Sequence, residues 1–400
     1  MRRHASLHSG PRPLADPSEV ALKRLTAAGI VLLALNLRIA VGEIPPVLRD
    51  LPLGDFGRSL LVTIPVICFS LAAFAGPPLS ARLGEERGLL IMCGALCAGL
   101  ALRPWWPSFS LYAGTILCGL AVAVMNVMMP SVLRRRFPER IGEMTAAYTM
   151  SLSIGAGLAA GLTVPLVHTL GGSVALALAI WSALAAIAFA LWLPQLRWPG
   201  PGDRAAGADI GLLRDWAAWQ ITLFFGLQSA LFYSLLSWLP TIYRDHGASP
   251  TAAGAMLAVM TAVGIVGNFA APLLAYRTGN AQLVVLGTSG LTAIGLAGVL
   301  FAPTELPLVW ATLLGIGTGG TFSLTLLLIA SRAHDAVIAA RLSSMAQGIG
   351  YMVAALGPLV AGLLHSVSGG WDLPIIVVIG VCCAQLAAGL GAARPGVVAR

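Results

Sequence analysis

The stretch "LLALNLRIAVGEIPPVLRDL", residues 32–51, combines a long apolar run with two charged side chains, Arg38 and Glu43. Apolar runs of about 20 residues recur along the whole chain, and each is long enough to cross a bilayer core of roughly 30 Å. Hydrophobic residues make up 58% of the 400 residues, and charged residues only 10%. Soluble proteins average about 25% charged residues. The sequence therefore predicts an all-α integral membrane protein.

Twelve apolar runs predict twelve transmembrane helices. Their approximate spans are residues 25–46, 58–78, 88–103, 108–130, 142–168, 172–194, 216–241, 250–275, 281–302, 306–330, 338–365 and 373–393. The longest polar connection falls between the sixth and seventh runs and divides the chain into two halves. We expect a cytosolic tail over residues 1–24, a six-helix bundle over 25–194, a cytosolic linker over 195–215, a second six-helix bundle over 216–393 and a short cytosolic tail over 394–400.

The basic residues predict the orientation in the membrane. If the N-terminus is cytoplasmic, the opposite side carries only Arg49, Arg58, Arg103 and Arg244, and Arg38 lies inside a helix. The other 19 of the 24 lysines and arginines then lie on the cytoplasmic side. This asymmetry is typical of the positive-inside rule, so we expect both termini in the cytoplasm and need no nucleic-acid partner to explain the net charge of +8.

The two halves repeat each other in sequence. The first helix ends in "PPVLRDLPLG" and the seventh in "LPTIYRDHGA", while the fifth contains "MSLSIG" (150–155) and the eleventh "MAQGIG" (345–350). Two six-helix bundles related by an axis along the membrane normal are the architecture of the major facilitator fold, whose binding site lies between the halves near the midplane. We therefore expect this fold.

Four blocks of the chain resemble the cyanate permease and 2-nitroimidazole transporter family of the major facilitator superfamily. They are "LNLRIAV", "NVMMPSVLRRRFPERIGEMTAAYTMSLSIGAGLAAGLTVPL", "GLQSALFYSLLSWLPTIYRDHG" and "RLSSMAQGIGYMVAALGPLVAGLLH". The resemblance implies secondary transport of a small anionic or polar planar solute, cyanate-like or 2-nitroimidazole-like, by alternating access across a bacterial inner membrane. Proton symport, export of small xenobiotics and a membrane sensor without net flux stay open as alternatives.

Arg38 is the first candidate for binding the solute. It lies about 13 residues, or roughly 20 Å, into the first predicted helix. An arginine cannot lose its charge, and a charge at this depth costs at least a few kcal/mol, so such residues face a bundle interior or a watery cavity. The planar guanidinium suits a carboxylate-like or other flat anion. The alternative interpretation is a permanent pair with an acid or with carbonyl groups at a helix end.

Glu43 is an acid inside an apolar span and a tentative candidate for proton coupling. A carboxylate taken out of water can load and release protons near neutral pH. A salt bridge with Arg38 and simple exposure at the outer end of the helix are the alternatives. Residues five apart on a helix lie about 140° apart around its axis, so Arg38 and Glu43 do not stack directly.

Polar and aromatic side chains in other predicted helices complete the candidate binding site. They are Asn126, Tyr148, Gln228, Tyr233, Trp238, Gln347 and Tyr351. Flat aromatic rings would suit a planar solute. The same residue types also form hydrogen bonds between packed helices, so a structural role is the alternative for each.

Other classes of protein receive no support from the sequence. An intramembrane enzyme would need a metal-binding cluster or a nucleophile with its base at depth, and we find neither. No phosphate-binding loop of the Walker type is present. We therefore expect no enzymatic activity, cofactor or metal. The expected partners are a small-molecule solute, the lipid bilayer and, for a symporter, protons, and we expect a monomer.

Overall fold

The computed structural model of the protein describes residues 17–105, 108–197, 212–333 and 336–394. All regular elements within these ranges are helices. The first half contains α1 (Pro17–Gly42), α2 (Asp55–Leu83), α3 (Glu85–Leu102), α4 (Phe109–Arg136), α5 (Ile141–Thr169), α6 (Val174–Ala179) and α7 (Trp181–Trp192). The second half contains α8 (Trp216–Asp245), α9 (Pro250–Thr278), α10 (Ala281–Phe301), α11 (Pro307–Arg332), α12 (Ala336–Ser368) and α13 (Asp372–Ala392). Short 3₁₀ helices are η1 (Pro45–Asp50), η2 (Pro138–Arg140), η3 (Leu193–Arg197) and η4 (Leu212–Arg214).

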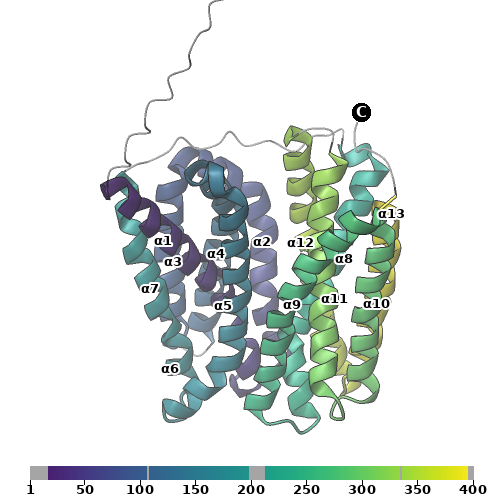
Figure 1. Cartoon of the computed structure of the whole chain (residues 1–400). Coiled ribbons are helices and arrows are strands. Elements are labelled where there is room, and N and C mark those ends of the chain that lie inside the picture. The colour runs from purple at the N-terminus through teal and green to yellow at the C-terminus, as the bar shows by residue number, and fades with distance from the viewer. Residues whose placement is uncertain (1–16, 106–107, 198–211, 334–335, 395–400) are drawn as a thin grey trace, which may run out of the picture.

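The helices form two bundles that stand side by side, α1–α7 and α8–α13 (Figure 1). Eleven segments in the described ranges are long and apolar enough to cross a membrane, and α6 and α7 together make one of them. The remaining predicted span, residues 88–103, corresponds to α3, an 18-residue helix whose charged first turn keeps it out of those eleven segments. The predicted all-α membrane fold is confirmed. The first helix begins at Pro17, earlier than the predicted residue 25.

The charged start of α3 is neutralised by the end of α4. Glu85 and Glu86 are almost fully buried. Arg135 lies 2.9 Å from Glu85 and 2.5 Å from Glu86, and Arg136 lies 2.7 Å from Glu86. The indole of Trp192 donates to the backbone carbonyl of Glu86 at 3.1 Å. These contacts tie α3, α4 and α7 together where charge would otherwise exclude α3 from the bundle.

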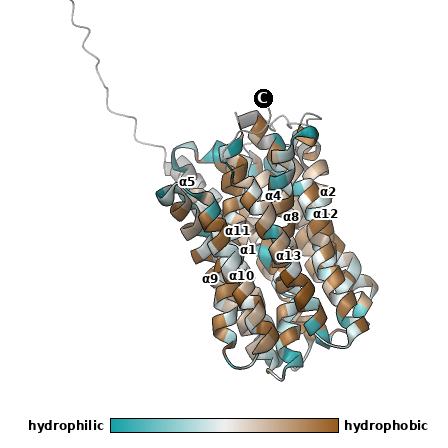
Figure 2. Cartoon of the chain, turned by 90° about the vertical axis from the view of Figure 1, so that its right-hand side faces the viewer, coloured by the Kyte–Doolittle hydropathy of each residue, from teal (hydrophilic) through white to brown (hydrophobic). Residues whose placement is uncertain are grey.

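Apolar side chains cover the outer surface of the bundles. Phe269, Leu286 and Ile294 are all about half exposed or more, as expected for helices whose outer faces meet lipid. Figure 2 shows hydrophobic residues along the helix faces, with hydrophilic residues concentrated near the ends. The distribution fits a bundle that spans a membrane.

The two halves meet through equivalent pairs of helices. Helix α2 packs on α12, and α5 packs on α9. In the first pair, Ser70 donates to the carbonyl of Gly348 at 2.8 Å. In the second, Gly254 lies so close to Ala160 that a Cβ at Gly254 would come within 2.7 Å of the Ala160 carbonyl oxygen. The interface therefore has the same twofold pseudosymmetry as the sequence repeat.

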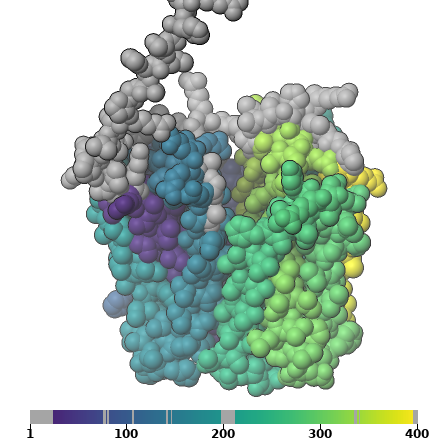
Figure 3. Space-filling view, viewed as in Figure 1, coloured from purple at the N-terminus to yellow at the C-terminus, as the bar shows by residue number. Residues whose placement is uncertain are grey.

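The bundle has two distinct ends. Helix α1 begins and α13 ends at one of them, which we call the terminal end, and the opposite one is the distal end (Figure 1). Figure 3 shows the halves in contact over the distal part and parted toward the terminal end. The protein is thus closed between its halves at the distal end.

Close packing of α1 against α5 yields a testable prediction. A Cβ at Gly155 would lie 2.3 Å from the backbone oxygen of Leu35, so Gly155→Ala must push the two helices apart. Overpacking of this kind costs about 1–3 kcal/mol. We expect the midpoint of thermal unfolding in detergent to fall by several degrees. The matched variant is Gly290→Ala on α10, where an added Cβ meets nothing within 4 Å, and an equal loss in both variants would contradict the prediction.

Candidate functional site

A cavity of about 220 Å³ lies between the two halves. Its walls come from α1 and α5 of the first half and from α8, α9, α11 and α12 of the second. The polar groups on the wall include Arg38, Thr149, Ser153, Gln228, Asn268 and Ser323. The rest of the lining is mainly apolar and aromatic. A cavity of this composition suits a small solute with one charged or strongly polar group.

Arg38 brings the positive charge of the cavity. Its Nη1 donates to the hydroxyl of Tyr233 at 3.4 Å, and its guanidinium lies 5.9 Å from the ring centre of Phe232. Among the described residues, no carboxylate lies within 4 Å of it, and the bond to Tyr233 is its only hydrogen bond. A guanidinium has five N–H donors, so most of the donors of Arg38 have no protein partner among the described residues.

Arg38 and Tyr233 occupy equivalent places in the two repeats. They are 195 residues apart, and so are Arg49 and Arg244 at the ends of the same repeat segments. The two side chains therefore meet across the pseudosymmetry axis, one from α1 and the other from α8. A solute bound here would contact both halves at once, as rocking of one half against the other requires.

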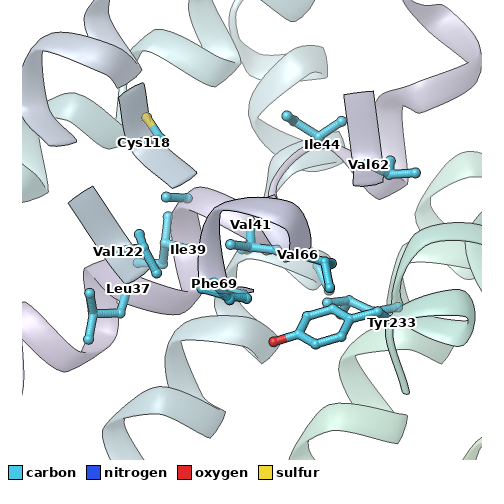
Figure 4. Close-up of a cluster of buried hydrophobic side chains, with 14 of the residues drawn as sticks. Leu37, Ile39, Val41, Ile44, Val62, Val66, Phe69, Cys118, Val122 and Tyr233 are labelled. Carbon is cyan, nitrogen blue, oxygen red and sulfur yellow. The ribbon is translucent and has the colours of Figure 1, made fainter. Parts of the chain in front are cut away.

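Aromatic rings surround this contact. Tyr233 lies 5.9 Å from Phe69 and 6.3 Å from Tyr351, measured between ring centres. Tyr351 in turn lies 5.1 Å from Phe225 in an edge-to-face arrangement. Figure 4 shows Tyr233 of α8 reaching toward Phe69 and Val66 of α2. The rings form an amphipathic wall next to the charge, with the Tyr233 hydroxyl directed to Arg38.

The structure brings four of the predicted binding residues into the cavity wall, namely Arg38, Gln228, Tyr233 and Tyr351. Gln228 is buried, and its amide interacts locally. It donates to the Thr318 carbonyl at 3.4 Å and accepts from the Ser229 hydroxyl at 3.2 Å. Gln228 therefore shapes the wall while part of its hydrogen-bonding capacity holds α8 against α11.

Two further predicted residues lie behind the wall. The Tyr148 hydroxyl donates to Asn126 Oδ1 at 3.0 Å, which joins α5 to α4. Tyr148 is also close enough to Arg38 to interact with its charge. Neither Tyr148 nor Asn126 lines the cavity.

Trp238 and Gln347 lie outside the cavity. The Trp238 indole donates to the Pro358 carbonyl at 2.8 Å and packs on Trp371 at the distal end. Gln347 donates to the Ser343 hydroxyl at 2.8 Å, one turn earlier on α12. Both side chains make the structural contacts that the sequence left open as their alternative role.

Glu43 has a partner that the sequence did not indicate. It forms a fully buried ion pair with Arg103, which follows α3, and the Nη2 of Arg103 also donates to the Ala40 carbonyl at 3.1 Å. Glu43 is therefore neither paired with Arg38 nor exposed at the outer end of the helix, because its side chain is fully buried. Arg103 itself, which the sequence placed at the end of the third predicted helix on the side opposite the cytoplasm, is only 2% exposed. The pair ties the end of α1 to the end of α3, five residues beyond Arg38.

Several wall residues were missed from the sequence. Phe232 and Phe322 sit in strongly apolar runs and give no signal of their own. Asn268 does, because a polar amide in the middle of the apolar segment Pro250–Thr278 is unusual. Its Oδ1 is buried and has no hydrogen-bond partner among the described residues. Asn268 therefore places a polar amide on the part of the wall that α9 forms.

The fold and the charged cavity between two pseudosymmetric bundles define a membrane transporter. The chain belongs to the major facilitator superfamily, whose sequence profile matches residues 26–355. An uncharacterized transporter of Bacillus subtilis (strain 168), YycB, is 35% identical over 374 residues, which cover 92% of each chain.

Two relatives from Escherichia coli (strain K12) are named for solutes. The 2-nitroimidazole transporter is 32% identical and matches 87% of this chain and 90% of its own length. The cyanate transport protein CynX is 31% identical and matches 88% of this chain and 94% of its own length. The resemblance to this group is therefore confirmed, and these relatives are transporters, not enzymes.

Solved structures show the same fold at low identity. A bacterial homologue of the human lysosomal transporter Spinster superposes with a TM-score of 0.76 at 13% identity and covers 95% of this chain and 98% of its own. The nucleoside transporter NupG superposes with a TM-score of 0.70 at 14% identity, with 92% and 100% covered. The architecture predicted from the repeats is confirmed.

The buried ion pair allows a second prediction. Glu43→Gln leaves the Arg103 guanidinium buried without a counter-charge, and breaking such a pair costs about 3–5 kcal/mol. We expect a clearly lower unfolding midpoint in detergent. The double variant Glu43→Gln with Arg103→Gln removes both charges and should recover much of the loss. A double variant as unstable as the single one would show that the pair is not the source of the stability.

Proposed function

We propose that the protein is a secondary transporter that moves a small anionic or polar planar solute by alternating access, with Arg38 as the anchor. The observation that carries the proposal is the placement of Arg38. Its charge faces a cavity between the halves and has no carboxylate partner among the described residues. A charge held in this way is costly unless an anion or polarised solute completes it.

The walls favour a planar solute over a bulky one. Tyr233, Phe232 and Phe322 present ring surfaces to the cavity, and flat aromatic faces pack well against planar molecules. The guanidinium forms paired hydrogen bonds with flat, two-oxygen groups such as carboxylate and nitro groups. The relatives named for cyanate and 2-nitroimidazole support solutes of this kind. A nitroheteroaromatic ring fills more of the cavity than the triatomic cyanate ion.

Proton coupling through Glu43 stays a prediction. Its carboxylate is fully buried and paired with Arg103, so a proton on Glu43 would leave Arg103 buried without a counter-charge. The variant that carries both Glu43→Gln and Arg103→Gln lacks the carboxylate but leaves no unpaired buried charge. If Glu43 couples transport to protons, this variant should stay folded and lose the acceleration of uptake by a proton gradient. We propose in addition a monomer in the bacterial inner membrane with both termini in the cytoplasm, which the distribution of basic residues supports.

Uptake into proteoliposomes tests the proposed function. We expect labelled cyanate or 2-nitroimidazole to enter above the level of empty liposomes. Arg38→Gln should weaken apparent affinity about tenfold or more, because a hydrogen bond to a charged group contributes about 1.5–3 kcal/mol. Arg38→Lys keeps the charge and loses the planar donor fork, so we expect it to recover activity only in part.

The matched control is Arg140→Gln. Arg140 is an exposed arginine that pairs with Glu143 within the same half, and neither residue lines the cavity. Uptake by Arg140→Gln should equal that of the unchanged chain. Equal uptake by Arg38→Gln, or no uptake of either solute by the folded chain, would contradict the proposal.

A further inference from the structure

The Arg-Asp pair that ends the repeated segment in each half contacts the same pair in the other half. Arg244 lies at the end of α8, and its two Nη atoms donate to the two carboxylate oxygens of Asp50 at 2.8 and 2.9 Å. Arg49 forms an ion pair with Asp245. Asp50 and Arg49 belong to η1, directly after α1. Two ion pairs therefore join the halves at the distal end.

The exchange of partners follows from the repeat. Arg49 and Arg244 are equivalent, as are Asp50 and Asp245, because each pair is 195 residues apart. Each arginine pairs with the aspartate of the other half instead of the aspartate next to it in sequence. Two equivalent segments can exchange partners in this way only if they face each other across the pseudosymmetry axis. Arg38 and Tyr233 meet on the same axis deeper in the protein.

These ion pairs are partly exposed to water. The side chains of Arg49 and Asp50 are 41% and 38% exposed, and those of Arg244 and Asp245 are 14% and 24% exposed. The pair of Glu43 and Arg103, which is fully buried, joins two helices of one half. A partly hydrated ion pair can break and re-form at little cost, whereas a buried pair cannot. The buried pair is thus suited to a permanent contact within one half, and the partly hydrated pairs are suited to a contact between the halves that can break.

Asp245 is held on its other side by the last two helices. The Trp371 indole donates to Asp245 Oδ2 at 2.7 Å, and His365 stacks on Trp371 with its Nε2 3.7 Å from the same oxygen. These contacts lie within the second half and fix the carboxylate in front of Arg49. Asp50 has no further side-chain contact of this kind among the described residues. Reversing the charges of Asp50 and Arg244 therefore disturbs fewer other contacts than reversing those of Arg49 and Asp245.

We propose that Arg49, Asp50, Arg244 and Asp245 form a reciprocal latch that holds the distal end closed and breaks when that end opens. The latch joins η1, which follows α1, to the distal end of α8, and α1 and α8 are the equivalent helices that carry Arg38 and Tyr233. Rocking the halves to open the distal end separates these helix ends and must break both ion pairs. The inference concerns the motion of the halves and does not depend on which solute is carried.

Distances between spin labels across the distal end test the latch in the full-length chain. The labels sit at Thr169→Cys at the end of α5 and Glu305→Cys between α10 and α11, in a chain whose six cysteines are replaced by serine. Asp50→Arg puts two positive charges in contact, and Arg244→Asp puts two negative ones in contact. We expect each to raise the ratio of open to closed distal ends about tenfold, since an ion pair of this kind contributes up to about 1 kcal/mol and repulsion adds to its loss.

The double variant that carries both Asp50→Arg and Arg244→Asp is the decisive one. It restores opposite charges at the same positions with reversed polarity and leaves Arg49 and Asp245 unchanged. We expect its distance distribution to return to that of the unchanged chain. If a charge reversal prevents folding, Asp50→Asn and Arg244→Gln remove the attraction without repulsion and should each raise the open fraction by a smaller factor.

A matched reversal at the other end is the control. Glu143→Arg breaks the exposed pair with Arg140, which lies within one half, and should leave the distal distances unchanged. Single variants with the distances of the unchanged chain, or a double variant as open as the single ones, would overturn the latch. The labels report the distal end without any solute, so failure of the uptake experiments would not decide this result.

Discussion

Arg38 places a permanent charge inside a helical bundle whose outer faces carry apolar side chains suited to lipid. The arrangement of the site follows from that constraint. The charge can be tolerated only beside polar groups or water, so α1 must turn it toward the space between the halves. Tyr233, its equivalent in the other repeat, meets it there. Aromatic rings surround this contact, and the guanidinium is the charged group on the cavity wall.

The ion pairs elsewhere in the protein also place each charge beside a partner, but they differ in how deeply they are buried. Glu43 and Arg103 neutralise each other out of contact with water and hold the end of α1 against the end of α3. Glu85 and Glu86 are neutralised by arginines at the end of α4. The Arg-Asp exchange at the distal end stays partly hydrated, and each of its pairs contributes no more than about 1 kcal/mol. Internal repetition thus supplies a partly hydrated interaction between the two halves.

Much of the architecture could be predicted, and the contacts of single side chains could not. Hydropathy located the helices because each apolar run must form its backbone hydrogen bonds within one helix. The same argument placed Arg38 facing a cavity. It did not separate Gln228 and Tyr351, which line the wall, from Trp238 and Gln347, which do not, because packing and binding use the same side chains.

The sequence by itself determined the membrane class, the twelve crossings, the two repeated halves and the presence of a charge at depth, since these depend on composition and on spacing along one helix. Only the tertiary structure decided which residues meet. Glu43 pairs with Arg103, 60 residues away in sequence, instead of with Arg38, five residues away. The tertiary structure also places Asn268 on the cavity wall. It pairs Arg49 and Arg244 each with the aspartate of the other half. Such pairings depend on how helices far apart in sequence pack, and one sequence carries no direct record of that packing.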